Sequence, residues 1–170
     1  MSSTSRAPVV RPRRPKRLLD PHGVRTLDGL YMEAYGQALA RRRTEPLAAH
    51  LHLPKLPELL SLSIAALTAP VLLGSPLSPA PFPDDLHDTA GRPVAVKGTG
   101  PSAWITVTGT DRLSHALVWV DYAERVRLAS AVTVRAVTDR DWLSAAPNRL
   151  TLVQLMSPAG PSFVDTTFHL

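Results

Sequence analysis

Two acidic residues and a lysine in the middle of the chain have types and a spacing that suit phosphodiester chemistry. Asp85 and Asp88 lie on a short segment that turns at Ala90–Gly91 and then enters a strand-like stretch ending at Lys97. A carboxylate on one strand can hold a divalent cation, and a lysine on the neighbouring strand can polarise the water that attacks a phosphate. One element is missing, because Ala95 stands where a second carboxylate is expected, two residues before the lysine.

The segments around this motif resemble the PD-(D/E)XK nucleases, and among them the compact type II restriction endonucleases. Pro83-Asp84-Asp85 supplies the Pro-Asp element, and the distance from Asp85 to Lys97 matches the family's spacing. The resemblance covers residues 80–145, with a helix over Leu27–Arg43 placed where the family has one. Within that range, three further segments resemble the family's hairpin, its next core strand, and the strand and short helix after it: residues 88–91, 116–122 and 132–142.

The resemblance implies metal-dependent cleavage of double-stranded DNA by a protein with a restriction-endonuclease-like core. Asp85 would be the catalytic, metal-binding aspartate, and Lys97 the catalytic lysine that orients the water. Asp84 would be the alternative metal ligand if the register shifts by one residue. The implied cofactor is magnesium. A homodimer is also implied, because cutting both strands of a duplex calls for two sites related by a twofold axis.

Ala95 leaves three interpretations of the site open. In the first, the acid was removed to trap a complex with substrate. In the second, another residue supplies it, and Glu33 on the first predicted helix is the candidate. In the third, the protein is a non-cutting descendant that only binds DNA. A plainer interpretation assigns no chemistry at all: the aspartates solvate a proline-rich loop, and the lysine ends an exposed strand.

Basic residues gather in two places and predict a polyanionic partner. The net charge is +5, which favours double-stranded DNA or another nucleic acid as that partner. Residues 1–20 are expected to form a basic, proline-rich arm ahead of a single α+β domain over residues 21–170. The predicted nucleic-acid-binding residues are Arg11, Arg13, Arg14, Lys16 and Arg17 in the arm, and Arg41, Arg42 and Arg43 at the end of a predicted helix. Two alternatives stay open: a solubilising, disordered arm, and arginines that only complement the helix dipole.

The elements that must position these residues follow from hydrophobic periodicity and turn residues. Helices are predicted over residues 27–43, 56–67 and 139–145, the last capped by Thr138, and an extended loop is predicted over residues 76–83. Strands are predicted over residues 92–98, 103–108, 116–122, 127–137 and 150–156. Residues 163–170 are left as an unassigned tail. The three tryptophans are expected in the core. The predicted fold is α+β, with N-terminal helices followed by a mostly antiparallel mixed sheet.

Composition narrows the remaining function classes. The chain has no cysteine, so it contains neither a disulfide framework nor a cysteine-based zinc site. The longest apolar run, residues 59–73, is shorter than a membrane span and is interrupted by Pro70, which favours a cytoplasmic protein without a membrane partner. The strongest alternative to a nuclease-like protein is a viral or phage capsid or nucleoprotein subunit that contacts packaged nucleic acid through the basic arm. A further alternative is an interaction domain without chemistry.

Overall fold

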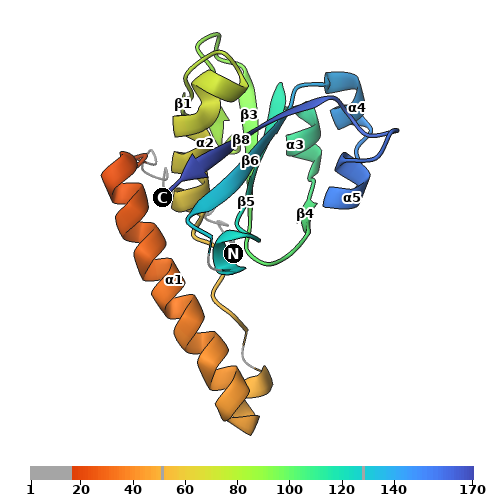
Figure 1. Cartoon of the computed structure of the whole chain (residues 1–170). Coiled ribbons are helices and arrows are strands. Elements are labelled where there is room, and N and C mark those ends of the chain that lie inside the picture. The colour runs from red at the N-terminus through yellow and green to blue at the C-terminus, as the bar shows by residue number, and fades with distance from the viewer. Residues whose placement is uncertain (1–16, 51, 128) are drawn as a thin grey trace, which may run out of the picture.

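A six-stranded mixed sheet with helices on both faces forms the body of the protein (Figure 1). The computed structural model describes residues 17–50, 52–127 and 129–170. The strand order is β1-β2-β3-β5-β6-β8, and a separate small sheet pairs β4 with β7. Neighbours in the main sheet are antiparallel except for β3 and β5, which are parallel. The predicted class, α+β with helices ahead of a mostly antiparallel mixed sheet, is confirmed.

Two helices precede the sheet, and both are longer than the sequence pattern predicts. Helix α1 spans Pro21–Thr44 and begins after Asp20, whose carboxylate accepts a hydrogen bond from the Gly23 N–H. The 3-10 turn η1 (Pro46–His50) follows it, and α2 spans Glu58–Leu72. The helix starts at residue 21 rather than at the predicted residue 27, six residues earlier. Proline is favourable at this first position, because a backbone N–H there would have no partner within the helix. Pro70 lies in the last turn of α2 and does not end the helix at residue 67.

The main sheet is built around a parallel pair of strands. Its strands are β1 (Ser78–Pro79), β2 (Leu86–His87), β3 (Pro93–Thr99), β5 (Ala116–Asp121), β6 (Ala131–Val137) and β8 (Phe163–His169). The chain leaves β3, passes through β4 and α3, and returns as β5 in the same direction, because parallel strands need a crossover. Every residue of β5 is buried, as expected for a central strand covered on both faces. The sequence left residues 163–170 unassigned, yet they supply the edge strand β8.

Short elements cover the second face of the sheet and correct several predictions. They are β4 (Trp104–Thr106), α3 (Gly109–Leu113), α4 (Arg140–Ser144), β7 (Arg149–Thr151) and α5 (Leu152–Leu155), with η2 (Arg125–Arg127) ahead of β6. The strand predicted over 150–156 is wrong beyond Thr151, because Thr151 and Gln154 form a capping box that starts α5. The cap of α4 is Asp139 and not Thr138. The strand predicted over residues 127–137 begins only at residue 131, and residue 127 belongs to the 3-10 turn η2 instead.

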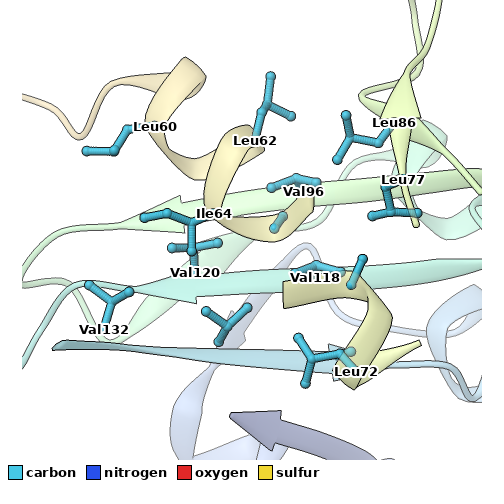
Figure 2. Close-up of a cluster of buried hydrophobic side chains, with 14 of the residues drawn as sticks. Leu60, Leu62, Ile64, Leu72, Leu77, Leu86, Val96, Val118, Val120 and Val132 are labelled. Carbon is cyan, nitrogen blue, oxygen red and sulfur yellow. The ribbon is translucent and has the colours of Figure 1, made fainter. Parts of the chain in front are cut away.

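Two apolar clusters lie on opposite faces of the sheet. On one face, α2 packs against β3, β5 and β6, and its Ile64 and Leu72 belong to the same apolar cluster as the strand valines, Val118 and Val120 among them (Figure 2). The other face holds a smaller cluster of Ala95, Ile105, Val107, Leu117, Trp119, Val137, Leu143, Ala146, Leu150 and Leu155. Trp119 is buried, but Trp104 is 39% exposed and was wrongly assigned to the core. Among the residues described, no helix has both the length and the hydrophobicity that a membrane span requires.

A largely buried ion pair joins α1 to η2, the turn between β5 and β6. The Arg125 guanidinium donates from Nε to Asp28 Oδ1 at 3.2 Å and from one terminal nitrogen to Asp28 Oδ2 at 2.7 Å. The other terminal nitrogen donates to the Ala129 carbonyl at 3.0 Å. Beside the pair, the rings of Tyr31 and Tyr122 meet edge to face, with centroids 5.9 Å apart. Burial and the Asp28 carboxylate raise the pKa of Tyr122, which therefore stays protonated.

Candidate functional site

The predicted hairpin between the two motif strands is present, and Asp88 organises it. The Asp88 carboxylate accepts hydrogen bonds from the backbone N–H groups of Ala90 and Arg92, each at 2.9 Å, and from the Arg92 guanidinium at 2.7 Å. Gly91 has a φ of 74°, a left-handed conformation that glycine adopts without a steric penalty. Asp88 thus has a structural role in the turn that joins β2 to β3.

These hydrogen bonds predict an acid-sensitive contribution of Asp88 to stability. Burial alone would raise the pKa of Asp88, but the hydrogen bonds from Arg92 and Ala90 outweigh burial and lower the pKa below its ordinary value of 3.8. A lowered folded-state pKa means that the carboxylate stabilises the fold above that ordinary value and stops doing so as the pH falls through the folded-state pKa. Replacing Asp88 with alanine should therefore cost about 2 kcal/mol at pH 7, measured by urea unfolding.

The same measurement at lower pH checks the cause. The difference in unfolding free energy between the native protein and Asp88→Ala should shrink steadily as the pH is lowered from 5 towards 2. Asp141→Ala, which removes an exposed carboxylate, serves as the control and should change stability little at any pH. A difference for Asp88→Ala that stays constant with pH would show that an ionised carboxylate is not the stabilising group.

The two candidate metal ligands, Asp84 and Asp85, hold groups of their own hairpin. Asp85 directly precedes β2, and its Oδ2 accepts a hydrogen bond from the Val96 N–H of β3 at 2.8 Å. Asp84 Oδ2 lies 3.1 Å from His87 Nε2. The structure therefore brings Asp85 to the strand that carries Lys97, as the resemblance implies, whereas Asp84 contacts a histidine three residues further along.

Lys97 forms an ion pair with a residue that sequence reasoning did not single out. Its ammonium lies 2.8 Å from Asp111 Oδ2, and the Lys97 and Asp111 side chains are 23% and 6% exposed. Asp111 belongs to the capping box of α3, in which its carboxylate accepts from the Thr108 N–H at 2.6 Å. The spacing of Thr108 and Asp111 could have predicted the cap, but the ion pair arises only when α3 folds back beside β3.

The position of the missing acid faces the apolar cluster of the second face. Ala95 is 3% exposed and packs there with Leu117 and Trp119. Glu33, the candidate replacement, is exposed on α1 and accepts a hydrogen bond from Gln37 at 3.2 Å. The carboxylate beside Lys97 is that of Asp111, so Glu33 is not the acid that accompanies the lysine.

The described carboxylates do not assemble a magnesium site. Within the described residues, no three acidic or histidine side chains group closely enough to hold a metal ion. Mg²⁺ requires oxygen ligands in near-octahedral geometry, and here Ala95 offers no side-chain oxygen while Asp85 accepts the Val96 N–H. These residues therefore do not fit the magnesium that the resemblance implies.

An open cavity of about 520 Å³ lies beside the motif, where β3 ends. Its walls come from the segment before α2, from the end of β3 and the loop after it, and from β4: Leu53, Pro54, Lys55, Leu56, Lys97, Gly98, Thr99, Gly100, Pro101, Ser102, Trp104, Ile105, Thr106 and Thr108, with Tyr31 of α1. The Arg149 guanidinium stacks 4.3 Å from the centroid of the Trp104 ring, and the Trp119 indole N–H donates to Thr99 Oγ1 at 2.8 Å. This cavity combines apolar walls with two lysines.

The basic residues predicted to bind nucleic acid are only partly within the described chain. Arg11, Arg13, Arg14 and Lys16 lie outside the described residues, and Arg17 is exposed. Arg41, Arg42 and Arg43 are exposed in the last turn of α1, which extends away from the sheet (Figure 1). Arg42 Nε donates to the Ala49 carbonyl at 3.3 Å, and among the described residues its other two guanidinium nitrogens have no hydrogen-bond partner. The residues just before α1 contact the core. The Leu19 N–H donates a hydrogen bond to Ser63 Oγ, and both Leu18 and Leu19 pack against the core.

Comparisons of the chain with protein-family models, with curated proteins and with solved structures find no match.

Proposed function

We propose that the chain is a DNA-binding protein with a restriction-endonuclease-like framework that holds duplex DNA without cutting it. The observation that carries this proposal is the hairpin that joins the motif strands: Asp85 precedes β2, contacts the Val96 N–H, and so lies beside the residue that precedes Lys97. The parallel strand β5 then follows β3 across a short helix. This arrangement agrees with the segments that carry the resemblance.

The same residues argue against cleavage. Phosphodiester hydrolysis of this kind needs a cluster of carboxylates around a cation and a lysine that faces the attacking water. Ala95 lies in an apolar cluster, and the Lys97 ammonium is paired with an Asp111 carboxylate that the cap of α3 holds in place. Of the three interpretations of Ala95, a non-cutting descendant therefore has the best support.

The proposed contacts to DNA are with phosphates. The three consecutive arginines in the last turn of α1 are all exposed, and the chain carries a net charge of +5. Each phosphate neutralised by lysine or arginine releases counterions, so binding of this kind weakens as salt rises. A homodimer remains part of the proposal, to be checked by the sedimentation of the full chain. No described feature favours the capsid or nucleoprotein alternative.

Binding and cleavage are tested separately on the full chain. A fluorescently labelled 20-base-pair duplex should bind with a Kd that rises steeply between 50 and 200 mM salt, as measured by anisotropy. The salt slope is the magnitude of the slope of log K against log salt concentration. The triple variant of Arg41, Arg42 and Arg43 to alanine should lower this salt slope by about 2 to 3, because each arginine that no longer neutralises a phosphate lowers it by about one. Plasmid DNA incubated with Mg²⁺ or Mn²⁺ should stay supercoiled.

A matched control is the double variant Arg127→Ala/Arg140→Ala, which removes exposed positive charge from other elements. Its salt slope should stay close to that of the native protein. A drop in slope that is the same per charge removed in both variants would mean that only the net charge matters. Absence of binding at 50 mM salt would overturn DNA binding, and metal-dependent nicking by the native protein would overturn the absence of cleavage.

A further inference from the structure

The cavity beside β3 contains a buried polar group that no described residue pairs with. Tyr31 is 4% exposed, and its hydroxyl has no hydrogen-bond partner among the described residues. The same residue lines the cavity, and a side chain at Gly100 would place its Cβ 3.1 Å from the Tyr31 hydroxyl. Burial raises the pKa of Tyr31 to about 12, so at neutral pH this hydroxyl can donate a hydrogen bond. A buried hydroxyl without a partner costs free energy, so a ligand that forms a hydrogen bond with it gains affinity.

The cavity also borders a stretch of β3 whose outer edge is not covered by another described strand. Strand β2 pairs with only Pro93 and Val94 of β3. The carbonyls of Pro93 and Thr99 accept hydrogen bonds from the His115 and Tyr122 N–H groups at the two ends of β5, so odd-numbered carbonyls of β3 point towards β5. Since peptide groups alternate along a strand, those of Gly98 point to the opposite edge. Gly98 lines this cavity and, with Val96, a smaller pocket beside α2, so its backbone is accessible to a ligand from that side of β3.

The remaining wall groups define the chemistry of that ligand. Leu53, Leu56 and Ile105 supply apolar surface, and the exposed side chain of Lys55 lies at the cavity. The Lys97 ammonium is already neutralised by Asp111, which leaves Lys55 as the cation for an anionic group. A ligand that matches these walls combines an apolar part that carries hydrogen-bonding groups with a negative charge. The volume of about 520 Å³ falls in the range of roughly 300–1,000 Å³ usual for small-molecule sites.

We propose that this cavity binds a single nucleotide, with its base against the apolar wall and the edge of Gly98, and its phosphate beside Lys55. Tyr31 donates a hydrogen bond to the base. This proposal rests on the proposed function. A protein that binds DNA encounters nucleotides whose bases are unpaired, and such a nucleotide would enter the cavity. A free nucleoside monophosphate has the same chemistry, so the two sources need separate experiments.

The first experiment uses free ligands. Each of the four 2′-deoxynucleoside 5′-monophosphates is titrated into the ¹⁵N-labelled protein, and amide shifts at Gly98 and Gly100 should saturate for at least one of them. Tyr31→Phe should weaken that Kd about tenfold, as expected when one hydrogen bond is removed. Tyr35→Phe is the matched control, because the Tyr35 ring lies 5.9 Å from the Tyr31 ring, centroid to centroid, but Tyr35 does not line the cavity. The Kd of this variant should not change. The parent nucleoside and inorganic phosphate alone should each bind more weakly than the monophosphate.

The second experiment uses DNA and separates this proposal from DNA binding as such. A 20-base-pair duplex with one unpaired base should bind at least tenfold more tightly than the fully paired duplex, and Tyr31→Phe should abolish that preference while leaving the affinity for the paired duplex unchanged. Saturation by free monophosphates without a preference for the unpaired base would assign the site to free nucleotides. No saturation and no preference, with paired duplex still bound, would overturn the nucleotide site alone.

A second pair of variants covers the case in which Tyr31→Phe unfolds. Lys55→Ala changes an exposed side chain, and Gly100→Ala narrows the cavity at the Tyr31 hydroxyl. Each should weaken monophosphate binding by about tenfold at unchanged thermal stability, since one removes the phosphate partner and the other blocks the phenol. Native affinity in both variants would overturn the site.

Discussion

Replacing Ala95 with glutamate is expected to destabilise the protein strongly and not to create a nuclease. The new carboxylate would enter an apolar cluster in which Ala95 is 3% exposed. Burying an unpaired charge and overpacking a filled core together cost about 3–5 kcal/mol. That is a large part of the roughly 5–15 kcal/mol by which domains are stable. The midpoint of urea unfolding, followed by circular dichroism, measures the destabilisation, and plasmid incubated with Mg²⁺ should remain intact.

Two controls separate charge from volume in this experiment. Ala95→Gln has nearly the same size without an ionisable group, so its destabilisation should not vary with pH. A buried glutamate has a raised pKa, and the penalty of Ala95→Glu should therefore diminish as the pH falls and the carboxyl group becomes protonated. Thr106→Glu adds an acid at an exposed position of β4 and should be nearly neutral. A stable Ala95→Glu protein that cuts DNA would show that position 95 opens onto an active site, contrary to the proposal.

Removing the Asp28 carboxylate is expected to have the second largest effect. The Asp28 side chain is 4% exposed and receives hydrogen bonds from the guanidinium of Arg125, whose side chain is 21% exposed. Breaking a buried pair leaves an uncompensated charge and costs about 3–5 kcal/mol. Arg125 keeps its bond to the Ala129 carbonyl and some solvent exposure, so the expected destabilisation by Asp28→Ala is about 2–4 kcal/mol. Urea unfolding of the full chain measures it.

A double-mutant cycle tests whether the unpaired charge causes this destabilisation. Asp28→Leu and Arg125→Met each remove one partner, and Asp28→Leu/Arg125→Met combines these two changes and replaces the whole pair with apolar groups. Such replacements are often close to neutral, so the double variant should be more stable than Asp28→Ala. If the double variant is destabilised by as much as the sum of the single changes, the pair contributes nothing specific and the packing of α1 alone explains the result.

The elements that sequence reasoning placed well are those with local signals. The hairpin before β3 has Gly91 at a left-handed position and alternating valines after it, and β5 has a continuous apolar run over residues 116–120. The errors occur where tertiary context decides. Residues 163–169 alternate polar and apolar side chains weakly, and they become a strand because β6 offers an open edge. The strand predicted over 150–156 ends early because a capping box competes with it.

In the candidate site, too, local features could be predicted from the sequence, and features that depend on tertiary structure could not. The position of Asp85 beside the Lys97 strand follows from a short hairpin and could be predicted from spacing. The partner of Lys97 could not, because Asp111 lies beyond β4 and reaches the lysine only through the crossover to β5. The burial of Ala95 depends on side chains as distant in sequence as Leu143 and Leu155. Tyr31 has the pattern of an ordinary helix-face residue, and only the fold places its hydroxyl at a cavity.

The order of elements along the chain has a consequence for synthesis on the ribosome. Helix α2 ends at Leu72, but the strands that cover its apolar face continue through β8, which ends at His169. At roughly 5–20 residues per second, the nearly one hundred residues between them take on the order of 5–20 s to translate. Throughout that interval Leu60, Leu62 and Ile64 lack the complete sheet that buries them. Until β6 and β8 emerge, the nascent chain therefore exposes an apolar helix face to which chaperones can bind.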